Sequence, residues 1–481
     1  MKVALALFVK NEVQDIGSWI GWHFAQGVDK LFIFDDHSTD GTYEVIQAAS
    51  TIRDIELTRT DPVATPDFYW RQANSFMEAC RRSVGVFDWI GFLDGDEYLS
   101  LDEAPAIGDF LAKFDGFNAV GLNWRIYGSG HRVLKTKIPA YDAFRFHATK
   151  DLDDQRLIKS FIRPETCSSE YINPHRFSVE GMNYADACGQ PITWVAEACK
   201  TIDWTHAAIN HYFSRTMEHY VERIRKRAGA DLADSTGYWD HFNRNDIYRE
   251  ERPETIAKAN AIAQQIKEAC VRTYAASLSG FPAIPFGRGP AGKVFGLRTH
   301  TGHGIALNQH NRFMHQHPED DASPKISGII YNDDPGHIYL VAENGHAVDN
   351  IPFYIKNDER YLCAYKFIIE KAGDSDGIHL KSPVTGKYLC FIPLDHGAAI
   401  ECNRDAASDW ETLFLSEKTS SGVTLSNCPL HMETKQKFLD FVRLHGSTLS
   451  YNDLLLALCS LPRAARTDVM EDKENTIISW L

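Results

Sequence analysis

The sequence lacks the cysteine and apolar patterns of secreted and membrane-spanning proteins. Its ten cysteines are scattered without a C-x-x-C pair, and a chain of 481 residues does not need disulfides to stabilise its core. No apolar run approaches the ~20 residues of a membrane-spanning helix. The apolar stretch 3–9 is short for a signal sequence and lacks a small-residue cleavage site. These absences predict a cytoplasmic protein with reduced thiols and no transmembrane segment.

Positive charge is also scarce. The chain has 50 Lys and Arg against 65 Asp and Glu, a net charge of -15, which argues against nucleic acid as a partner and against passive adhesion to an anionic membrane. An anionic ligand such as a nucleotide would need a metal ion or a local basic cluster. Apolar residues make up 44% of the chain, which is typical of a soluble globular protein of about two to four domains.

Residues 1–93 alternate between buried strands and amphipathic helices. We expect strands at 3–9, 31–34, 55–58 and 87–93, separated by helices at 13–24, 43–49 and 68–84. This order predicts a parallel, doubly wound sheet with helices on both faces. A strand at 119–124 and helices from 217 and at 253–274 continue the pattern. The cations in the last turns of the helix from 217, among them Arg223, suit the helix dipole as well as they suit phosphate binding.

The strand at 87–93 runs into Asp94-Gly95-Asp96, followed by Glu97. Side chains two apart on a strand point the same way, so Asp94 and Asp96 can face one point. Two carboxylates held that close need a neutralising cation or proton, and a hard divalent ion that also bridges phosphate oxygens meets this need. The alternative for a bare Asp-X-Asp is an ordinary solvated turn.

The ends of two other predicted strands also carry polar clusters. Lys10-Asn11-Glu12 follows the first strand, and Asp35-Asp36 begins a polar loop that contains Asp40 after the second. Ligands of doubly wound sheets bind at the carboxyl ends of the strands. Three clusters at one edge therefore favour binding over the solvated turn.

The composition changes after residue 280. A Pro- and Gly-rich linker at 280–292 ends a first domain at 1–279. Residues 293–418 show a weak repeat of about 40 residues, marked by Leu297, Leu340 and Leu380, which predicts three all-β units packed as a β-trefoil of the fascin type. The tail at 428–481 reads as a small helical appendage.

The three polar clusters, in this order, resemble those of GT-A fold glycosyltransferases, closest to family-2-like bacterial enzymes and the family-92 group. The resemblance covers about residues 1–250 and implies a Rossmann-like domain that binds a nucleotide-sugar donor, a UDP-sugar. It implies that Asp94 and Asp96 hold Mn²⁺ or Mg²⁺, with His175 and His211 as further ligands, although a lone histidine is more often structural. The donor-binding residues that it implies are Lys10, Asn11, Glu12, Asp35, Asp36, Asp40, Lys159 and Arg163.

The acceptor side is less clear from the sequence. An inverting transfer needs a carboxylate near the acceptor hydroxyl, and the family's acid motif for this role is not evident; Asp240 and Asp246 are the candidates. The acceptor would be a glycan or a lipid-linked molecule, which leaves peripheral attachment at the inner membrane face open. The trefoil could bind carbohydrate or protein.

Two other classes of function compete with transfer. A nucleotidyltransferase would carry a Gly-rich phosphate loop after the first strand, and Lys10-Asn11-Glu12 is no such loop. A non-enzymatic scaffold would have no use for intact acids at Asp94 and Asp96.

Overall fold

The structure is a computed structural model. It describes residues 1–278 except 134, 137 and 228–234, residues 292–418 with gaps at 308–313, 318–324, 345–346, 350–352, 358–359, 365 and 398, and residues 432–472. The chain divides into two compact units, Met1–Cys270 and Val271–Ser479. The predicted linker at 280–292 lies almost wholly outside the described residues.

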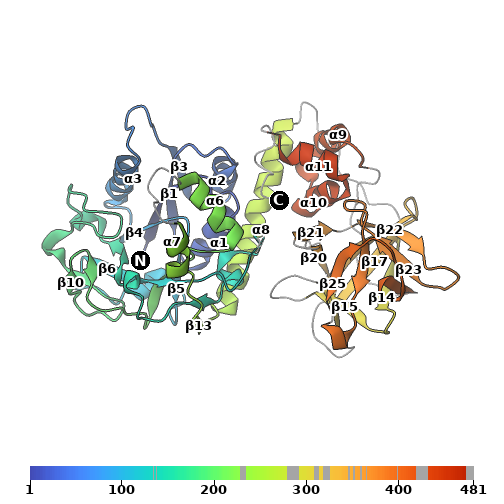
Figure 1. The fold of residues 1–481 in the computed structure, drawn as a ribbon. Coiled ribbons are helices and arrows are strands. Elements are labelled where there is room, and N and C mark those ends of the chain that lie inside the picture. The colour runs from blue at the N-terminus through green and yellow to red at the C-terminus, as the bar shows by residue number, and fades with distance from the viewer. Residues whose placement is uncertain are drawn as a thin grey trace. The chain divides into compact units, whose positions relative to one another are not determined.

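The first unit is built on a mixed sheet (Figure 1). Its strands follow the order β3-β2-β1-β4-β8-β6-β12-β5, with β9 beside β6. The main strands are β1 (Val3–Val9), β2 (Lys30–Asp35), β3 (Ile55–Arg59), β4 (Trp89–Leu93), β5 (Glu97–Leu101), β6 (Ala119–Ile126), β8 (Ile158–Ile162), β9 (Tyr184–Ala185) and β12 (Ala207–His211). The first four are parallel, as the sequence predicts, whereas β8 runs antiparallel to β4 and β6, and β5 antiparallel to β12. The prediction of an all-parallel sheet is therefore correct only for its first half.

Helices cover both faces of this sheet (Figure 1). The helices of the first unit are α1 (Ile16–Ala25), α2 (Thr42–Ser50), α3 (Phe68–Ser83), α4 (Ile107–Leu111), α5 (Ala140–Ala143), α6 (Met217–Arg227), α7 (Ser235–Phe242) and α8 (Pro253–Leu278), the last of which continues past Cys270. Local sequence sets their ends. Gly27, with a φ of 85° that favours glycine, follows the last turn of α1. The Asp67 carboxylate caps α3 by accepting the N–H of Trp70.

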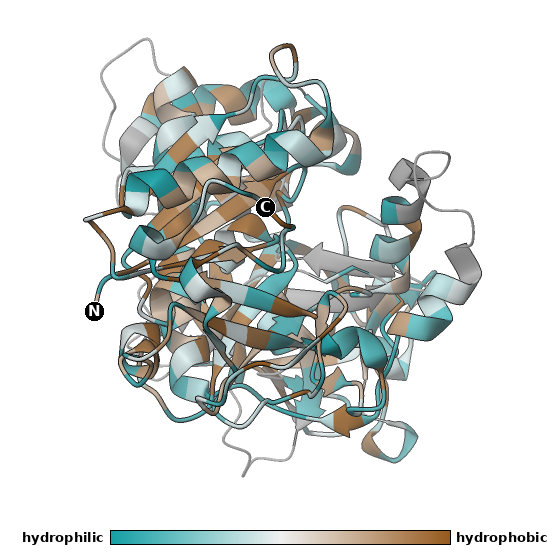
Figure 2. Ribbon diagram, turned by 90° about the vertical axis from the view of Figure 1, so that its left-hand side faces the viewer, coloured by the Kyte–Doolittle hydropathy of each residue, from teal (hydrophilic) through white to brown (hydrophobic). Residues whose placement is uncertain are grey.

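The core lies on the two faces of the parallel strands. Every residue of β1 and β4 is buried, and Figure 2 shows brown, apolar strands in the interior of this unit. Ala4 and Phe8 on β1 share an apolar cluster with Phe76 of α3 and Phe92 of β4. Because side chains alternate along a strand, the intervening residues of β1 pack on the opposite face. Both faces are apolar, so the polar rim at the strand ends is the natural place for a ligand.

Short strands and 3-10 turns complete the first unit. The strands are β7 (Phe146–His147), β10 (Trp194–Val195), β11 (Ala198–Cys199) and β13 (Ile247–Tyr248), and the turns are η1 (Asp153–Arg156), η2 (Pro164–Thr166) and η3 (Glu180–Met182). β13 pairs with β7, and β10 pairs with β11.

The second unit is rich in strands. The strands are β14 (Gly292–Thr299), β15 (Gly304–Leu307), β16 (Met314–His317), β17 (Lys325–Tyr331), β18 (His337–Asn344), β19 (Ala347–Asp349), β20 (Phe353–Asn357), β21 (Arg360–Ala364), β22 (Lys366–Lys371), β23 (Ile378–Lys381), β24 (Tyr388–Phe391), β25 (Ile400–Arg404) and β26 (Thr412–Glu417). β26 pairs with both β14 and β23, which closes the ring β14-β17-β18-β22-β23-β26. This barrel-like arrangement agrees with an all-β second domain, and its assignment as a trefoil stays a prediction.

The end of the described chain is helical. The helices are α9 (Lys435–His445), α10 (Tyr451–Ser460) and α11 (Arg463–Met470), with the 3-10 turn η6 (Gly446–Thr448) between the first two; η4 (Leu394–His396) and η5 (Asp409–Glu411) lie among the strands. Within the described residues, no helix combines the length and apolar character needed to cross a membrane.

Candidate active site

Two of the predicted polar clusters are bound to each other at the strand ends. The N–H of Asn11 donates to Ser38 Oγ at 2.9 Å, and Asn11 Oδ1 accepts the N–H of Thr39 at 2.9 Å. The carboxylate of Asp40 accepts the N–H of Val13 at 3.1 Å. Asn11 itself has a φ of 55°, a conformation that asparagine tolerates better than most residues. Asn11 and Asp40 thus hold the loops after β1 and β2 together.

Asp35 and Asp36 are buried and paired with cations. Asp36 accepts two hydrogen bonds from Arg71, at 2.6 Å from Nε and 2.9 Å from Nη2, and lies 3.3 Å from Lys10 Nζ. Arg59 Nε donates to Asp35 at 3.2 Å. Burial acts to raise the pKa of Asp36, but the Arg71 and Thr60 hydrogen bonds and the nearby cations lower it to about 2. Both side chains are paired within the protein, and their role in binding the donor stays a prediction.

Lys159 lies between two acids of the turn after β4. Its Nζ is 2.6 Å from Asp94 Oδ2 and 3.1 Å from Glu97 Oε2, and the Lys159 side chain is fully buried. Trp124 Nε1 donates to Glu97 Oε1 at 2.7 Å. Burial raises the pKa of Glu97, an effect that the charge of Lys159 opposes. We call residues 94–97 the acidic turn. The predicted donor residue Lys159 therefore reaches it.

Asp96 has a different pair of partners. Arg223 Nη1 donates to Asp96 Oδ2 at 2.9 Å, and His211 Nε2 lies 3.5 Å from the same oxygen. Burial acts to raise the pKa of Asp96, but the charges of His211 and Arg223 outweigh it and hold that pKa well below its usual range. Asp96 is thus a carboxylate that the fold keeps ionised.

The two predicted histidine ligands lie near the acidic turn. Both rings pack against Trp124, with centroid separations of 5.0 Å for His175 and 4.4 Å for His211. Burial, aided by the charge of Lys159, lowers the pKa of His175 to about 4. Its Nδ1 lies 3.1 Å from the carbonyl of Ile158. His211 is the histidine that reaches a carboxylate of the motif.

A divalent cation fits part of this arrangement. In the described part of the chain, no three His, Cys, Asp or Glu side chains are already placed to hold a metal ion. Asp96 Oδ2 and His211 Nε2 are 3.5 Å apart, somewhat wider than the about 3.0 Å between adjacent ligands of an octahedral ion with bonds of about 2.1 Å, so a small movement would let both bind one ion. Asp94 is bound to Lys159 instead. The predicted metal site stays a prediction, with Asp96 and His211 as the pair whose geometry suits it.

Other predicted residues lie away from the acidic turn. In the antiparallel pairing of β4 with β8, Ile90 is opposite Ile162, so Arg163 is at the opposite end of the strand from Asp94. Its Nε donates to the carbonyl of Phe117 at 3.0 Å. Arg163 therefore lies away from the acidic turn, and its predicted role in donor binding stays a prediction.

The two candidate bases share no partner with the acidic turn among the described contacts. Asp246 lies 2.9 Å from Arg244 and accepts the N–H of Thr149 at 3.2 Å. Asp240 is exposed on α7. Their catalytic role stays a prediction.

Arg215 is a further buried cation that the sequence interpretation did not single out. Its Nη1 donates to Asp15 at 2.6 Å and to Glu12 at 3.2 Å. Burial raises the pKa of Glu12, which Arg215 counteracts. Only the run Asn210–Arg215 hinted at this position, since Arg215 follows the predicted ligand His211 by four residues.

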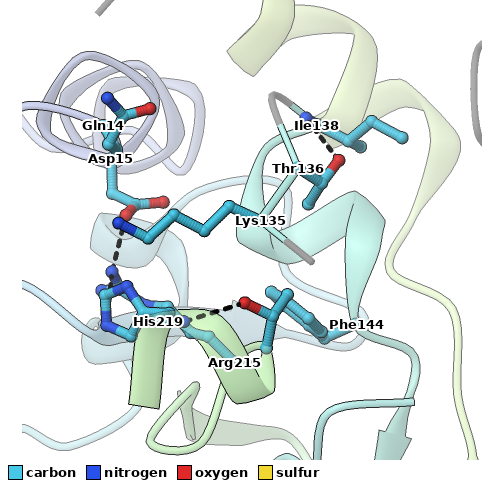
Figure 3. Close-up of a pocket in the computed structure, with 9 residues that line it drawn as sticks. Gln14, Asp15, Lys135, Thr136, Ile138, Phe144, Arg215 and His219 are labelled. Atoms are coloured by element: carbon cyan, nitrogen blue, oxygen red, sulfur yellow. Dashed lines mark hydrogen bonds and ion pairs between the residues drawn. The ribbon is translucent and has the colours of Figure 1, made fainter. Parts of the chain in front are cut away.

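A cavity adjoins Arg215 (Figure 3). Its walls come from the residues that precede α1, from residues near position 136, and from the residues that precede and begin α6. The lining residues are Gln14, Asp15, Lys135, Thr136, Ile138, Phe144, Arg215, Thr216 and His219. His219 lies on α6, the helix that also carries Arg223, the partner of Asp96.

Comparisons with known proteins point to one family. The model of glycosyltransferase family 92 matches residues 3–252. A family 92 protein of Oryza sativa subsp. japonica is 25% identical over 48% of this chain and 36% of its own length, and one of Ricinus communis is 24% identical over 48% and 39%. The chain thus spans well under half the length of these relatives. A crystal structure of S. aureus TarS 1-349 in complex with UDP-GlcNAc covers 58% of this chain and 76% of that chain at 11% identity, but its TM-score of 0.26 supports no inference.

Proposed function

The chain belongs to glycosyltransferase family 92, and we propose that it transfers a sugar from a nucleotide-diphosphate donor, a UDP-sugar, to a hydroxyl of a glycan or lipid-linked acceptor. The observation that carries this proposal is the acidic turn after β4, where Asp94 and Asp96 lie among the cations Lys159 and Arg223. It lies at the carboxyl end of a parallel strand, where such sheets bind ligands.

The reaction requires stabilisation of a leaving diphosphate. The acceptor oxygen forms a bond to the anomeric carbon while the bond from that carbon to the diphosphate oxygen breaks, and the electron pair stays on the diphosphate. Positive groups fixed where this charge develops lower the barrier without rearranging during the reaction. Lys159, held by Asp94 and Glu97, is such a fixed cation. Arg223, about a third exposed, is more accessible to a ligand.

A divalent cation, Mn²⁺ or Mg²⁺, would be held by Asp96 and His211, with Asp94 beside them, and would supply further positive charge to the diphosphate. Arg223 shares Asp96 Oδ2 with His211, so it would have to give up this contact when the ion binds.

The acceptor must lose a proton as its oxygen attacks. In an inverting transfer this proton goes to a carboxylate within hydrogen-bond reach of the acceptor hydroxyl. Asp240 and Asp246 remain our candidates for this base.

The test is nucleotide release by the full chain. The purified protein is incubated with UDP-sugars and a panel of glycan and lipid-linked acceptors, with Mn²⁺ or with a chelator. We expect acceptor-dependent release of UDP. Release of pyrophosphate from UTP and a sugar phosphate would instead identify a nucleotidyltransferase, and failure to bind or turn over any nucleotide would support a scaffold.

A further inference from the structure

The cavity at the start of α6 is lined in part by a buried arginine that is only partly paired. Arg215 is 4% exposed. Its Nη1 binds Asp15 and Glu12, whereas its Nε and Nη2 are buried and have no hydrogen-bond partner among the described residues. Buried N–H groups are nearly always paired in native proteins. Two orphaned N–H groups on one guanidinium therefore call for a ligand.

The two unpaired nitrogens form one edge of the guanidinium. Nε–H and the neighbouring Nη2–H lie side by side in the planar group, a fork that matches two oxygens of a carboxylate or phosphate. Lysine carries the same charge but cannot offer this pair of parallel donors. The edge left free is thus suited to an oxyanion.

The backbone at Arg215 supports a functional role. Its φ is 47°, in the left-handed region that a residue with a long side chain rarely adopts. Such strain persists where the surrounding structure enforces it, often at a binding site. Here it occurs between β12, which carries His211, and α6, which carries Arg223.

The charges around the cavity are mixed, with cations on the side of α6. Arg215, Arg223 and Lys135 all act on His219, whose pKa burial and these charges lower to about 2. His219 is therefore a neutral wall of the cavity. Lys135 binds Glu222, and Asp15 binds Arg215 Nη1, so these two acids are already paired.

We propose that this cavity is an oxyanion site in which Arg215 binds a phosphate or carboxylate group through Nε and Nη2. The oxyanion has two possible sources, the diphosphate of the donor or an acidic group on the acceptor. Assigning the source rests on the proposed function; the site itself does not. A water molecule could also satisfy the two N–H groups, and the experiment separates it from an anion.

The test measures binding of inorganic phosphate to the full chain by calorimetry, at constant ionic strength against chloride. Arg215→Lys keeps the charge beside Glu12 and Asp15 but removes the fork. We expect it to raise the Kd for phosphate at least about tenfold. Arg81→Lys is the matched control, because the Arg81 side chain is 70% exposed and pairs with Glu78 on the surface of α3; it should bind phosphate as the wild type does.

A second variant leaves Arg215 intact. Gln14 is exposed at the cavity, so Gln14→Trp should obstruct the cavity without disturbing the Arg215 ion pairs, and should also weaken phosphate binding. Wild-type affinity in a folded Arg215→Lys protein, or in Gln14→Trp if Arg215→Lys does not fold, would overturn the proposal. So would absence of phosphate binding to the wild type, which is the result expected for a water site.

Competition with UDP identifies the source. If UDP displaces phosphate, the oxyanion belongs to the donor; if both bind together, it belongs to the acceptor. Phosphate binding that depends on Arg215 in a protein that binds no nucleotide would support the site and contradict the proposed function. UDP release without Arg215-dependent phosphate binding would support the proposed function and contradict the oxyanion site.

Discussion

At the scale of single residues, Asp96 combines three features expected of a functional carboxylate. It is largely buried, kept ionised, and adjacent to both a histidine and an arginine. A solvated acid in an ordinary turn would have none of these features. Its replacement should therefore affect activity far more than a surface change does.

We expect Asp96→Asn to lower metal-stimulated UDP release by about 10²- to 10³-fold, the usual cost of removing an electrostatic stabiliser of the transition state. Asn keeps the volume but not the charge that binds Arg223 and a cation. The free energy of unfolding should fall by about 1–3 kcal/mol, because partly buried partners lose their counter-charge. Asp115→Asn is the control, since the Asp115 side chain is 84% exposed beside Arg163. Normal turnover in Asp96→Asn would contradict the proposed site. Wild-type transfer that survives exhaustive chelation would contradict the proposed role of a metal ion in it.

Asp36 gives a prediction about acid stability. Its pKa is lowered from 3.8 to about 2 in the folded chain, so its charged form stabilises the fold above pH 3.8 and this contribution is lost as pH falls through about 2. Asp36→Asn should lower the free energy of unfolding at neutral pH, and the difference from wild type should shrink as pH falls from about 4 to about 2. Urea unfolding across this range measures it. Asp54→Asn, which removes an exposed pair with Lys30, should change little; a pH-independent deficit in Asp36→Asn would show that Asp36 acts by packing alone.

The sequence identified the acids of the rim better than their partners. Asp35, Asp36, Asp94 and Asp96 follow predicted strands, and strand ends can be read from local apolar patterns. Arg71 lies 35 positions from Asp36, and Lys159 lies 65 from Asp94. Such pairs depend on tertiary packing, which a single sequence does not encode locally. The position of Arg163 could not be predicted for the same reason, because the direction of β8 in the sheet decides which end of the strand faces the acids.

At the scale of elements, α1 and α8 pack closely enough that one glycine is required and another is not. A Cβ at Gly21 would lie 2.7 Å from the carbonyl oxygen of Ala259 on α8, whereas one at Gly17 would meet its nearest neighbours at 3.9 Å. The two positions lie one turn apart on the same helix. They therefore make a matched pair for testing the contact between the helices.

We expect Gly21→Ala to lower the free energy of unfolding by about 1–3 kcal/mol through overpacking. Gly17→Ala should raise it by up to about 1 kcal/mol, because alanine favours the helix. Thermal or urea unfolding of the two variants beside the wild type measures whether the free energy of unfolding falls in Gly21→Ala and rises in Gly17→Ala. Equal effects would mean that α8 does not press on α1 at this point.

The alternating strands and helices of residues 1–93 were predictable because apolar runs and helix periodicity are local signals. The antiparallel strands were not. β8 and β5 are as completely buried as the parallel strands β1 and β4, and nothing within either strand records which neighbour it will join. The strands of the second unit were predictable for the same reason, because turns and short apolar runs are also local signals, whereas the trefoil inferred from the weak repeat stays a prediction.

At the scale of the whole molecule, the family match ends before the first unit does. The match stops at residue 252, yet α8 packs on this unit through Ala259 and Ile266, and Asn260 accepts a hydrogen bond from the Tyr141 hydroxyl at 2.8 Å. The fold therefore needs a helix that lies beyond the matched region.

We expect a fragment of residues 1–279 to unfold cooperatively and to retain UDP binding, and limited proteolysis of the full chain to cut within 287–292. A fragment of residues 1–252 should unfold at a lower temperature or aggregate, since it exposes the apolar surface that α8 covers. Circular dichroism melts of the two fragments provide the comparison. A folded 1–279 that binds no nucleotide would contradict the assignment of the donor site to this unit.

The position of β5 has a consequence for the timing of assembly. Only residues 94–96 separate β4 from β5, yet β5 pairs with β12, more than a hundred residues later in the chain. β12, the partner strand of β5, also contains His211, whose Nε2 lies 3.5 Å from Asp96 Oδ2. At about 5–20 residues per second, a ribosome needs roughly ten seconds to travel from one strand to the other. During that interval the nascent chain holds the acidic turn without the strand that carries His211, so the site that we propose is complete only once β12 has joined the sheet.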